Sequence, residues 1–109
     1  MTDYNPDHWV IIKMTHKDEI FYKVLGGWAG GYLNGTSWRL NSGIERCEED
    51  GDRLKFYGSS GSCYTVHKDM YGLRTATVGI WRTMKNAHPE AVELMPEETD
   101  SVNMSWNKE

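Results

Sequence analysis

Several features that would assign a small protein to a functional class are missing from this sequence. It has two cysteines, Cys47 and Cys63, and four histidines, but none of them has the C-x-x-C or H-x-x-x-H spacing that indicates a zinc site. No apolar run approaches the roughly 20 residues that span a bilayer, and no N-terminal apolar run follows a basic region as in a secretory signal. We therefore expect a cytoplasmic protein with reduced thiols, no bound metal or cofactor, and no membrane association.

An excess of positive charge is also absent. The chain of 109 residues has 12 Lys and Arg against 16 Asp and Glu, a formal net charge of −4. Residues 1–95 carry eleven basic and twelve acidic side chains, so most of the negative charge falls in the segment 96–109. Binding to duplex nucleic acid needs a basic face that neutralises several phosphates, and we therefore expect none.

Aromatic residues compensate for a low apolar content. Hydrophobic residues make up 39% of the chain, but they include five Trp, six Tyr and two Phe. Each ring buries a large area, so a few of them can organise a thin core. A surplus of rings favours contacts with a ligand or with another chain, and we expect a homo-oligomer in which such rings are covered.

Most of the predicted elements are strands. β-Branched and aromatic residues over 9–14 and 20–25 predict an N-terminal hairpin, with apolar residues on both faces as in strands from the interior of a sheet. A meander of three strands is predicted over 44–66, where an Asp-Gly turn and a Gly-Ser-Ser-Gly turn separate the runs. A further short strand is predicted over 37–40.

A helix is predicted over 75–87, because apolar residues recur there at helical spacing, with a threonine as its N-cap and Pro89 beyond its end. Residues 91–95 fit a last strand or a short second helix equally well. The expected fold is α+β, a bent antiparallel sheet or small open barrel of five to six strands with one packed helix.

The two ends of the chain are predicted to be less ordered than the middle. The polar segment 1–7 is expected to fray, residues 8–95 to form a single β-rich domain, and the acidic segment 96–109 to be disordered. Deleting 96–109 would then leave the melting temperature unchanged, whereas a large drop would mean that Trp106 packs against the domain or a partner subunit.

The glycine-rich segment 26–43 is the most unusual part of the sequence. Six of its residues are glycine, yet its rings are too large for a free linker. We therefore expect a structured, Ω-like loop. Because rings stack on bases, guanidinium groups pair with phosphate and amides bond to polar edges, this segment is the main candidate for a ligand site.

The candidate site combines rings, arginines and small polar residues. All five arginines lie between residues 39 and 82, among several tyrosines, and the Gly-Ser-Ser-Gly turn adds hydroxyls and amides suited to an anion. The candidate ligand-binding residues are Trp28, Tyr32, Trp38, Arg39, Asn41, Ser59, Ser60, Tyr64, Tyr71 and Arg74. The competing interpretation is that the rings belong to the core, that the arginines pair with carboxylates, and that the serines form an ordinary hairpin turn.

No catalytic motif is present. A His-Lys-Asp triplet occurs twice, beginning at His16 and at His67, but contiguous residues in a turn lack the H-x-K spacing of phospholipase-D-type enzymes. Cys63 has no base beside it that would make it a nucleophile. A phosphodiester hydrolase that uses His67 or His16 is therefore only the third interpretation.

The short chain, its content of Trp, Tyr and Gly, and its charged tail resemble small accessory proteins of tailed bacteriophages. Some proteins of that kind bind nucleotide-derived immune signals, and others block a host protein. The resemblance implies a non-catalytic protein that sequesters a small phosphorylated, nucleotide-like ligand in the bacterial cytoplasm. The alternative is a protein–protein interaction module, or an inhibitor of a host protein, that uses the aromatic-rich loop.

Overall fold

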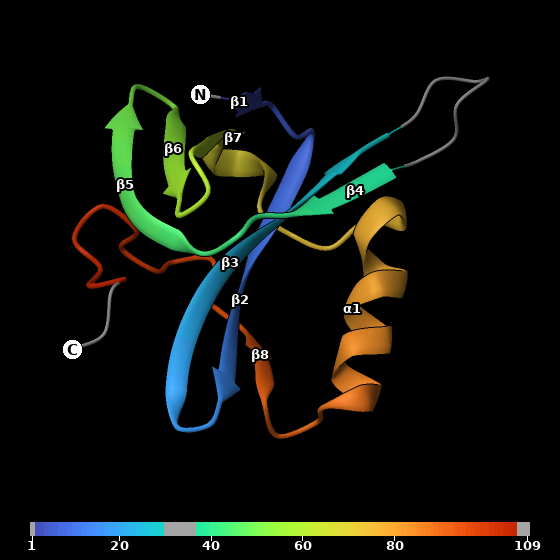
Figure 1. Cartoon of the computed structure of the whole chain (residues 1–109). Coiled ribbons are helices and arrows are strands. Elements are labelled where there is room, and N and C mark those ends of the chain that lie inside the picture. Colours follow the sequence, from blue (N-terminus) through green and yellow to red (C-terminus); the bar gives the residue numbers. More distant parts are fainter. Residues whose placement is uncertain (1, 30–36, 107–109) are drawn as a thin grey trace.

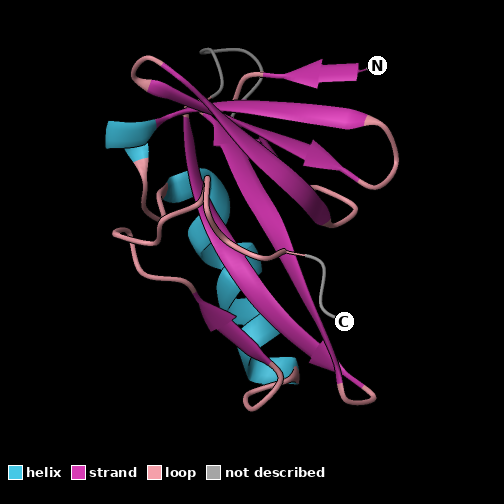
Figure 2. Cartoon of the chain, turned by 90° about the vertical axis from the view of Figure 1, so that its left-hand side faces the viewer, coloured by secondary structure: helices cyan, strands magenta, loops and turns pink. Residues whose placement is uncertain are grey.

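The computed structural model describes residues 2–29 and 37–106. They form an α+β arrangement of two four-stranded sheets and one α-helix, and the strands do not close into a barrel (Figures 1 and 2). Sheet A has the strand order β1-β7-β6-β5 and consists of β1 (Thr2–Tyr4), β5 (Ile44–Asp50), β6 (Arg53–Gly58) and β7 (Ser62–His67). Sheet B has the order β4-β3-β2-β8 and consists of β2 (His8–His16), β3 (Glu19–Trp28), β4 (Ser37–Leu40) and β8 (Val92–Leu94).

The predicted N-terminal hairpin is confirmed, and both of its strands lie in the interior of sheet B. β2 pairs with β3 and β8, and β3 pairs with β2 and β4. Along the hairpin, the pair Val10 and Leu25 belongs to the core under the helix, whereas the pair Ile11 and Val24 belongs to the core between the sheets. Apolar side chains alternate to both faces because both faces of this hairpin are covered.

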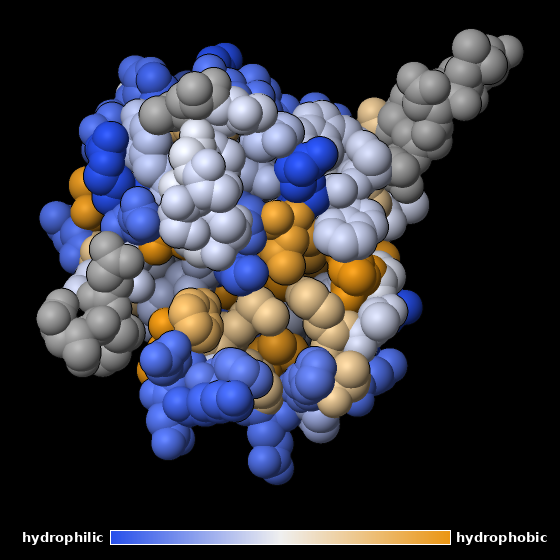
Figure 3. Space-filling view, viewed as in Figure 1, coloured by the Kyte–Doolittle hydropathy of each residue, from blue (hydrophilic) through white to orange (hydrophobic). Residues whose placement is uncertain are grey.

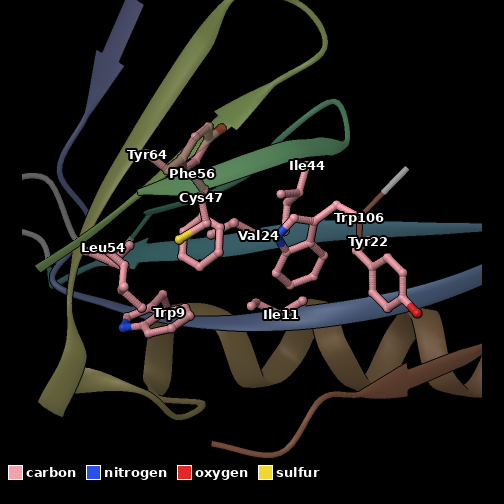
Figure 4. Packing of buried hydrophobic residues seen from close by; sticks show 11 residues of the cluster. Trp9, Ile11, Tyr22, Val24, Ile44, Cys47, Leu54, Phe56, Tyr64 and Trp106 are labelled. Atoms are coloured by element: carbon pink, nitrogen blue, oxygen red, sulfur yellow. The ribbon is translucent and has the colours of Figure 1, made fainter. Parts of the chain in front are cut away.

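The two sheets enclose the larger hydrophobic core. Sheet B contributes Trp9, Ile11, Tyr22 and Val24, and sheet A contributes Ile44, Cys47, Leu54, Phe56, Tyr64 and Val66 (Figure 4). Burial raises the pKa of the Cys47 thiol to about 12, so this cysteine is a core residue and not a thiolate nucleophile. Both cysteines are buried and neither forms a disulfide.

The predicted helix is also confirmed. It is α1 (Thr75–Ala87), which covers the other face of sheet B through Ile80, Trp81 and Met84. Its N-cap is Arg74 and not a threonine as predicted, because the Arg74 N–H donates to Thr77 Oγ1 at 3.1 Å one turn into the helix. Among the residues that the structure describes, no helix is long and apolar enough to cross a membrane.

The remaining local predictions need small corrections. The segment 91–95 contains the strand β8 and not a second helix, and the chain after β7 forms the short 3₁₀ helix η1 (Lys68–Met70). The Ω-like loop predicted over 26–43 is replaced at both ends by strands, since β3 runs to Trp28 and pairs there with Ser37 of β4. Residues 30–36 lie outside the described residues.

Part of the N-terminal segment that was expected to fray forms a strand. Thr2–Tyr4 form β1, which pairs in parallel with β7 and matches Tyr4 with Tyr64. Pro6 is buried against Gly26, where a Cβ would lie 2.6 Å from Pro6 Cγ. The pairing partner is distant in the sequence and β1 has three residues, so local patterning does not predict it. With β8 it brings the strands to eight, above the expected five to six, and it makes one pairing parallel.

The acidic segment, for which disorder is the expectation, places Trp106 against the domain. Trp106 is 4% exposed, and its ring centroid lies 5.1 Å from that of Tyr22 and 6.1 Å from that of Phe56 (Figure 4). Its Nε1 donates to the Ser101 carbonyl at 3.0 Å. The acidic composition of this segment favoured disorder. One buried tryptophan is too weak a signal in the sequence to indicate that the segment packs against the core. Residues 107–109 lie outside the described residues.

We therefore expect Trp106→Ala to lower the free energy of unfolding by about 3–5 kcal/mol, the usual cost of truncating a core aromatic. Val102→Ala is the matched control, because Val102 is 41% exposed in the same segment and should change stability by less than about 0.5 kcal/mol. Chemical denaturation of both variants measures the difference. Equal stabilities would show that the segment does not contribute to the core.

Candidate functional site

Asn41, which follows β4, is a buried polar residue at the junction of the two sheets. It is 3% exposed. Its backbone N–H donates to the Val24 carbonyl at 3.0 Å, and its Oδ1 accepts from the Val24 N–H at 2.9 Å. These bonds orient the side-chain amide, and its Nδ2 is left with no hydrogen-bond partner among the described residues. A buried donor without a partner costs about 1–3 kcal/mol, which favours an acceptor supplied from outside the chain.

The unpartnered Nδ2 lies beside Gly58, which is buried at the end of β6. A Cβ on Gly58 would lie 3.4 Å from Asn41 Nδ2, 3.2 Å from Ser42 Oγ and 2.9 Å from Ser62 Oγ. Three polar groups from two segments of the chain therefore lie close around Gly58, and a Cβ there would require the Ser62 hydroxyl to move. We call Gly58 and these three groups the Gly58 cradle.

The Gly-Ser-Ser-Gly turn is bound to the connection between β4 and β5. Ser42 Oγ accepts from the Ser60 N–H at 2.9 Å and lies 3.0 Å from the Ser59 hydroxyl and 3.1 Å from the Ser60 hydroxyl. Gly43 and Gly61 have φ values of +142° and +90°, which side chains disfavour. The serines thus form the predicted hairpin turn and lie at the junction of the two sheets with Asn41 and Gly58. We call this junction, together with Arg39 on β4, the polar corner.

Three of the predicted site residues gather around Tyr4. The Tyr4 ring centroid lies 4.9 Å from that of Tyr64 and 6.5 Å from that of Trp28, and the Arg39 guanidinium carbon lies 4.6 Å from the Tyr4 centroid. Burial raises the pKa of Tyr64 to about 12, although the Arg39 charge opposes the rise. Tyr4 was not among the predicted site residues because it lies in the segment that was expected to fray.

Arg39 takes part in none of the ion pairs among the described residues. In contrast, Arg46 pairs with Glu48 on β5, and Lys68 pairs with Glu49. Arg39 and Asn41 are two positions apart, so they lie on the same side of the extended chain at the end of β4. β4 and the residue after it therefore carry an exposed guanidinium over Tyr4, without a carboxylate, and a buried amide beside Gly58, without an acceptor among the described residues.

The other predicted site residues lie elsewhere. Trp38 pairs with Gly27 and is 47% exposed on the α1 side of sheet B, the face opposite to Arg39. Arg74 caps α1. Tyr32 lies outside the described residues, so its place in the site stays a prediction.

Tyr71 has a structural role that the sequence analysis did not predict. Its hydroxyl donates to the Met95 carbonyl and accepts from the Ile11 N–H at 3.2 Å. Its ring packs edge-on against Trp9 with a centroid distance of 4.6 Å. Tyr71 thus connects η1, β2 and the chain after β8, and it is not part of the corner.

Two hollows open beside the corner. The larger has a volume of about 660 Å³, lies between the β2–β3 hairpin and the start of β5, and includes Ser42 and Ser59 in its lining. Phe21 and Ser42 also line a second hollow of about 340 Å³, which lies closer to the chain after α1. Figure 3 shows the apolar side chains that gather on this face between β3 and α1.

Comparison with protein-family models, curated proteins and solved structures finds no match to this chain. Within residues 2–29 and 37–106, no group of three His, Cys, Asp or Glu side chains could hold a metal ion. His16 and His67, the candidates for catalysis, lie at the ends of strands in different sheets. The chemistry of the corner, neutral donors with one guanidinium, suits the binding of an acceptor or an anion.

His8 is the second buried polar residue with an unpartnered atom. It is 3% exposed, and its Nε2 has no hydrogen-bond partner in the described part of the chain. A Cβ on Gly27 would lie 2.3 Å from Nε2 and 2.8 Å from Thr77 Cγ2, so the imidazole fills the gap between β3 and α1. Burial lowers the pKa of His8, the Arg74 charge lowers it further, and the Asp7 carboxylate opposes them.

We therefore expect His8 to make stability dependent on pH. Because its pKa is lower in the folded protein than its ordinary value of 6.5, the unfolded chain binds the proton more readily. The free energy of unfolding should be highest above that value and should fall as pH drops through it toward the folded-state pKa. Denaturation of wild type and His8→Gln between about pH 7.5 and 5.5 measures the effect. Equal slopes in the two proteins would contradict it.

Proposed function

We propose that this protein is a non-catalytic binding protein for a small phosphorylated, nucleotide-like ligand. The observation that carries the proposal is the buried Asn41 Nδ2, which has no partner and faces the Gly58 cradle. A phosphate or sugar oxygen placed at the cradle would accept from this amide and from the Ser62 hydroxyl after that hydroxyl rotates, whereas the Ser42 hydroxyl already donates to Ser60. Such an oxygen would remove the free-energy cost of burying this N–H group without a hydrogen bond. In the free protein, that cost remains unless a water accepts the hydrogen bond.

Arg39 supplies the charge that a phosphate needs. Its guanidinium is held over Tyr4 and is not paired with a carboxylate within the described residues. A planar guanidinium can donate two parallel hydrogen bonds to one phosphate. Because it is already oriented by the ring, less conformational entropy is lost on binding than for a free arginine.

The other arginines limit the kind of ligand. Arg46 is paired with Glu48, and Arg74 lies at the start of α1 beside His8. At the corner itself, one guanidinium with neutral donors suits a mononucleotide or cyclic nucleotide better than a polyanion. In the context of the phage resemblance, the ligand would be a nucleotide-derived signal of the host cytoplasm that the protein sequesters.

A protein-interaction module, or an inhibitor of a host protein, is the second candidate. Phe21 and Trp38 are 41% and 47% exposed, and the strand register places both on the α1 side of sheet B. Exposed aromatic side chains of this kind often carry much of the binding energy at protein interfaces. The absence of stabilisation by any nucleotide would favour this second function over the first.

The first test is thermal unfolding in the presence of linear and cyclic mononucleotides. A ligand at about one hundred times its dissociation constant should stabilise wild type by about 2.7 kcal/mol. Arg39→Ala should lose that stabilisation, while its own stability falls by no more than about 1 kcal/mol, the value of an exposed cation–π contact. Arg82→Ala is the control, because Arg82 is exposed on α1. If the nucleotide stabilised Arg39→Ala as much as wild type, Arg39 would not be part of the site. If no nucleotide stabilised wild type, the proposed function would be wrong.

Gly58→Ala tests the cradle. Its methyl group would occupy the space between Asn41 Nδ2 and the Ser62 hydroxyl, which can rotate aside. We expect binding to weaken by about tenfold or more, as for the loss of one hydrogen bond from a polar site. Gly79→Ala on α1 is the control, since nothing lies within 4 Å of its Cβ, and there alanine should stabilise the helix by about 0.5–1 kcal/mol. Unchanged ligand affinity in Gly58→Ala would rule out the cradle as the contact point.

A further inference from the structure

β3 has an open edge next to the hairpin turn. β4 is in register with β3 only over residues 25–28 of β3, and Asn41 extends the contact by its two hydrogen bonds to Val24. The chain then bends at Ser42 and continues as β5 in the other sheet. Residues 19–23 therefore pair with β2 on one side and, among the described residues, with no strand on the other.

The backbone groups of Ile20 and Tyr22 point outward at this edge. Val24 both donates to and accepts from Asn41 on the outward side, and hydrogen-bonded positions alternate along an antiparallel ladder. Ile20 and Tyr22 have the same phase as Val24, so their N–H and C=O groups point away from β2, whereas those of Phe21 point toward it. The outward groups are therefore available to a further strand.

The two hollows described above lie along this edge. Ile20, Phe21 and Tyr22 line the larger hollow, and Phe21 and Lys23 line the second one. Phe21 is 41% exposed between them. A strand added beside β3 would run between the two hollows and cover the ring of Phe21.

The side chains along the edge are complementary to a second copy of themselves. Leu25 belongs to the core under the helix, so by alternation Glu19, Phe21 and Lys23 lie on the same α1 side of β3. In an antiparallel pairing of two copies centred on Phe21, Glu19 of each copy lies opposite Lys23 of the other, and the two Phe21 rings lie side by side. Neither Glu19 nor Lys23 takes part in an ion pair among the described residues.

We infer that two copies of this chain associate through the open edge of β3, antiparallel and centred on Phe21. The N–H and C=O groups of Ile20 in each copy bond to those of Tyr22 in the other. Opposite charges and paired aromatic rings placed directly across a ladder stabilise it. The two-fold symmetry makes both ends of the contact identical, and the strand order across the dimer becomes β8-β2-β3-β3-β2-β8.

The outer edge of sheet A is less suited to such a contact. Its strand β5 carries four carboxylates and one arginine. Two copies of β5 side by side would bring an excess of like charges together, which is a common way for proteins to protect an edge from pairing. The charges of β3 are balanced instead, so the same electrostatics that keep β5 apart favour the pairing of β3.

Charge reversal tests the pairing. Glu19→Lys places lysines opposite each other at both ends of the contact, and Lys23→Glu places carboxylates there. Each variant should raise the dissociation constant of the dimer, measured by sedimentation equilibrium, at least about tenfold, because two attractive cross-strand pairs become repulsive. Asp69→Lys is the matched control, since Asp69 is exposed in η1 and far from this edge in the sequence and the fold, and it should leave the dissociation constant unchanged.

An equimolar mixture of the two single variants is the sharper test. In a mixed dimer each lysine again lies opposite a glutamate, so the mixture should associate about as tightly as wild type. The double variant Glu19→Lys, Lys23→Glu should also recover the wild-type dissociation constant. Recovery shows at the same time that the single variants are folded, because an unfolded chain could not restore the contact.

Amide hydrogen exchange locates the ladder. The N–H groups of Ile20 and Tyr22 are bonded only in the dimer, so their exchange should slow as the protein concentration rises. The N–H groups of Phe21 and Lys23 bond to β2 within one copy, and their exchange should not depend on concentration in this way.

Three results would overturn the inference. They are a wild-type protein that stays monomeric at about 1 mM, single variants that dimerise as tightly as wild type, and a mixture that associates no better than its separate components. Arg39 and Asn41 are unchanged in all of these variants, so failure of the dimer would leave the proposed nucleotide site as it stands.

Discussion

The β2–β3 hairpin packs against a hydrophobic core on each of its faces, and the other elements depend on this two-sided burial. Ile11 and Val24 face sheet A, while Val10 and Leu25 face α1. A slip of one residue in the pairing would exchange the two faces, so the register is strongly specified. Because the Val24 backbone also forms both hydrogen bonds that hold Asn41, the same register sets the position of the candidate binding amide.

The elements that could be predicted from the sequence are those with a local signal. Alternating apolar residues and an Asp-Gly turn indicated the two hairpins, and helical spacing indicated α1 with the bounds that the structure has. β1 and the packing of Trp106 were missed for the opposite reason. A three-residue strand gains its stability from a partner far along the chain, and a lone ring in an acidic tail gives no periodicity.

Residue types alone predicted some members of the candidate site and failed to predict others. Arg39, Asn41 and the serines meet because each lies at the end of a strand or in a turn near the junction of the sheets. Tyr71 was misassigned, because a tyrosine that satisfies buried backbone groups has the same sequence signature as one that stacks on a ligand. The Gly58 cradle was not predictable, since Asn41 and Ser42 meet Gly58 and Ser62 only through the junction of the two sheets.

The central claim is that a ligand oxygen pairs with Asn41 Nδ2. The side-chain NH₂ resonances of Asn41 in ¹H–¹⁵N spectra, assigned with Asn41→Asp, report on this atom directly. On titration with AMP, the account predicts that these resonances shift with the same dissociation constant as a calorimetric titration, and that exchange of the NH₂ protons with solvent slows. Saturation of the protein with AMP while the Asn41 resonances stay unchanged would contradict it.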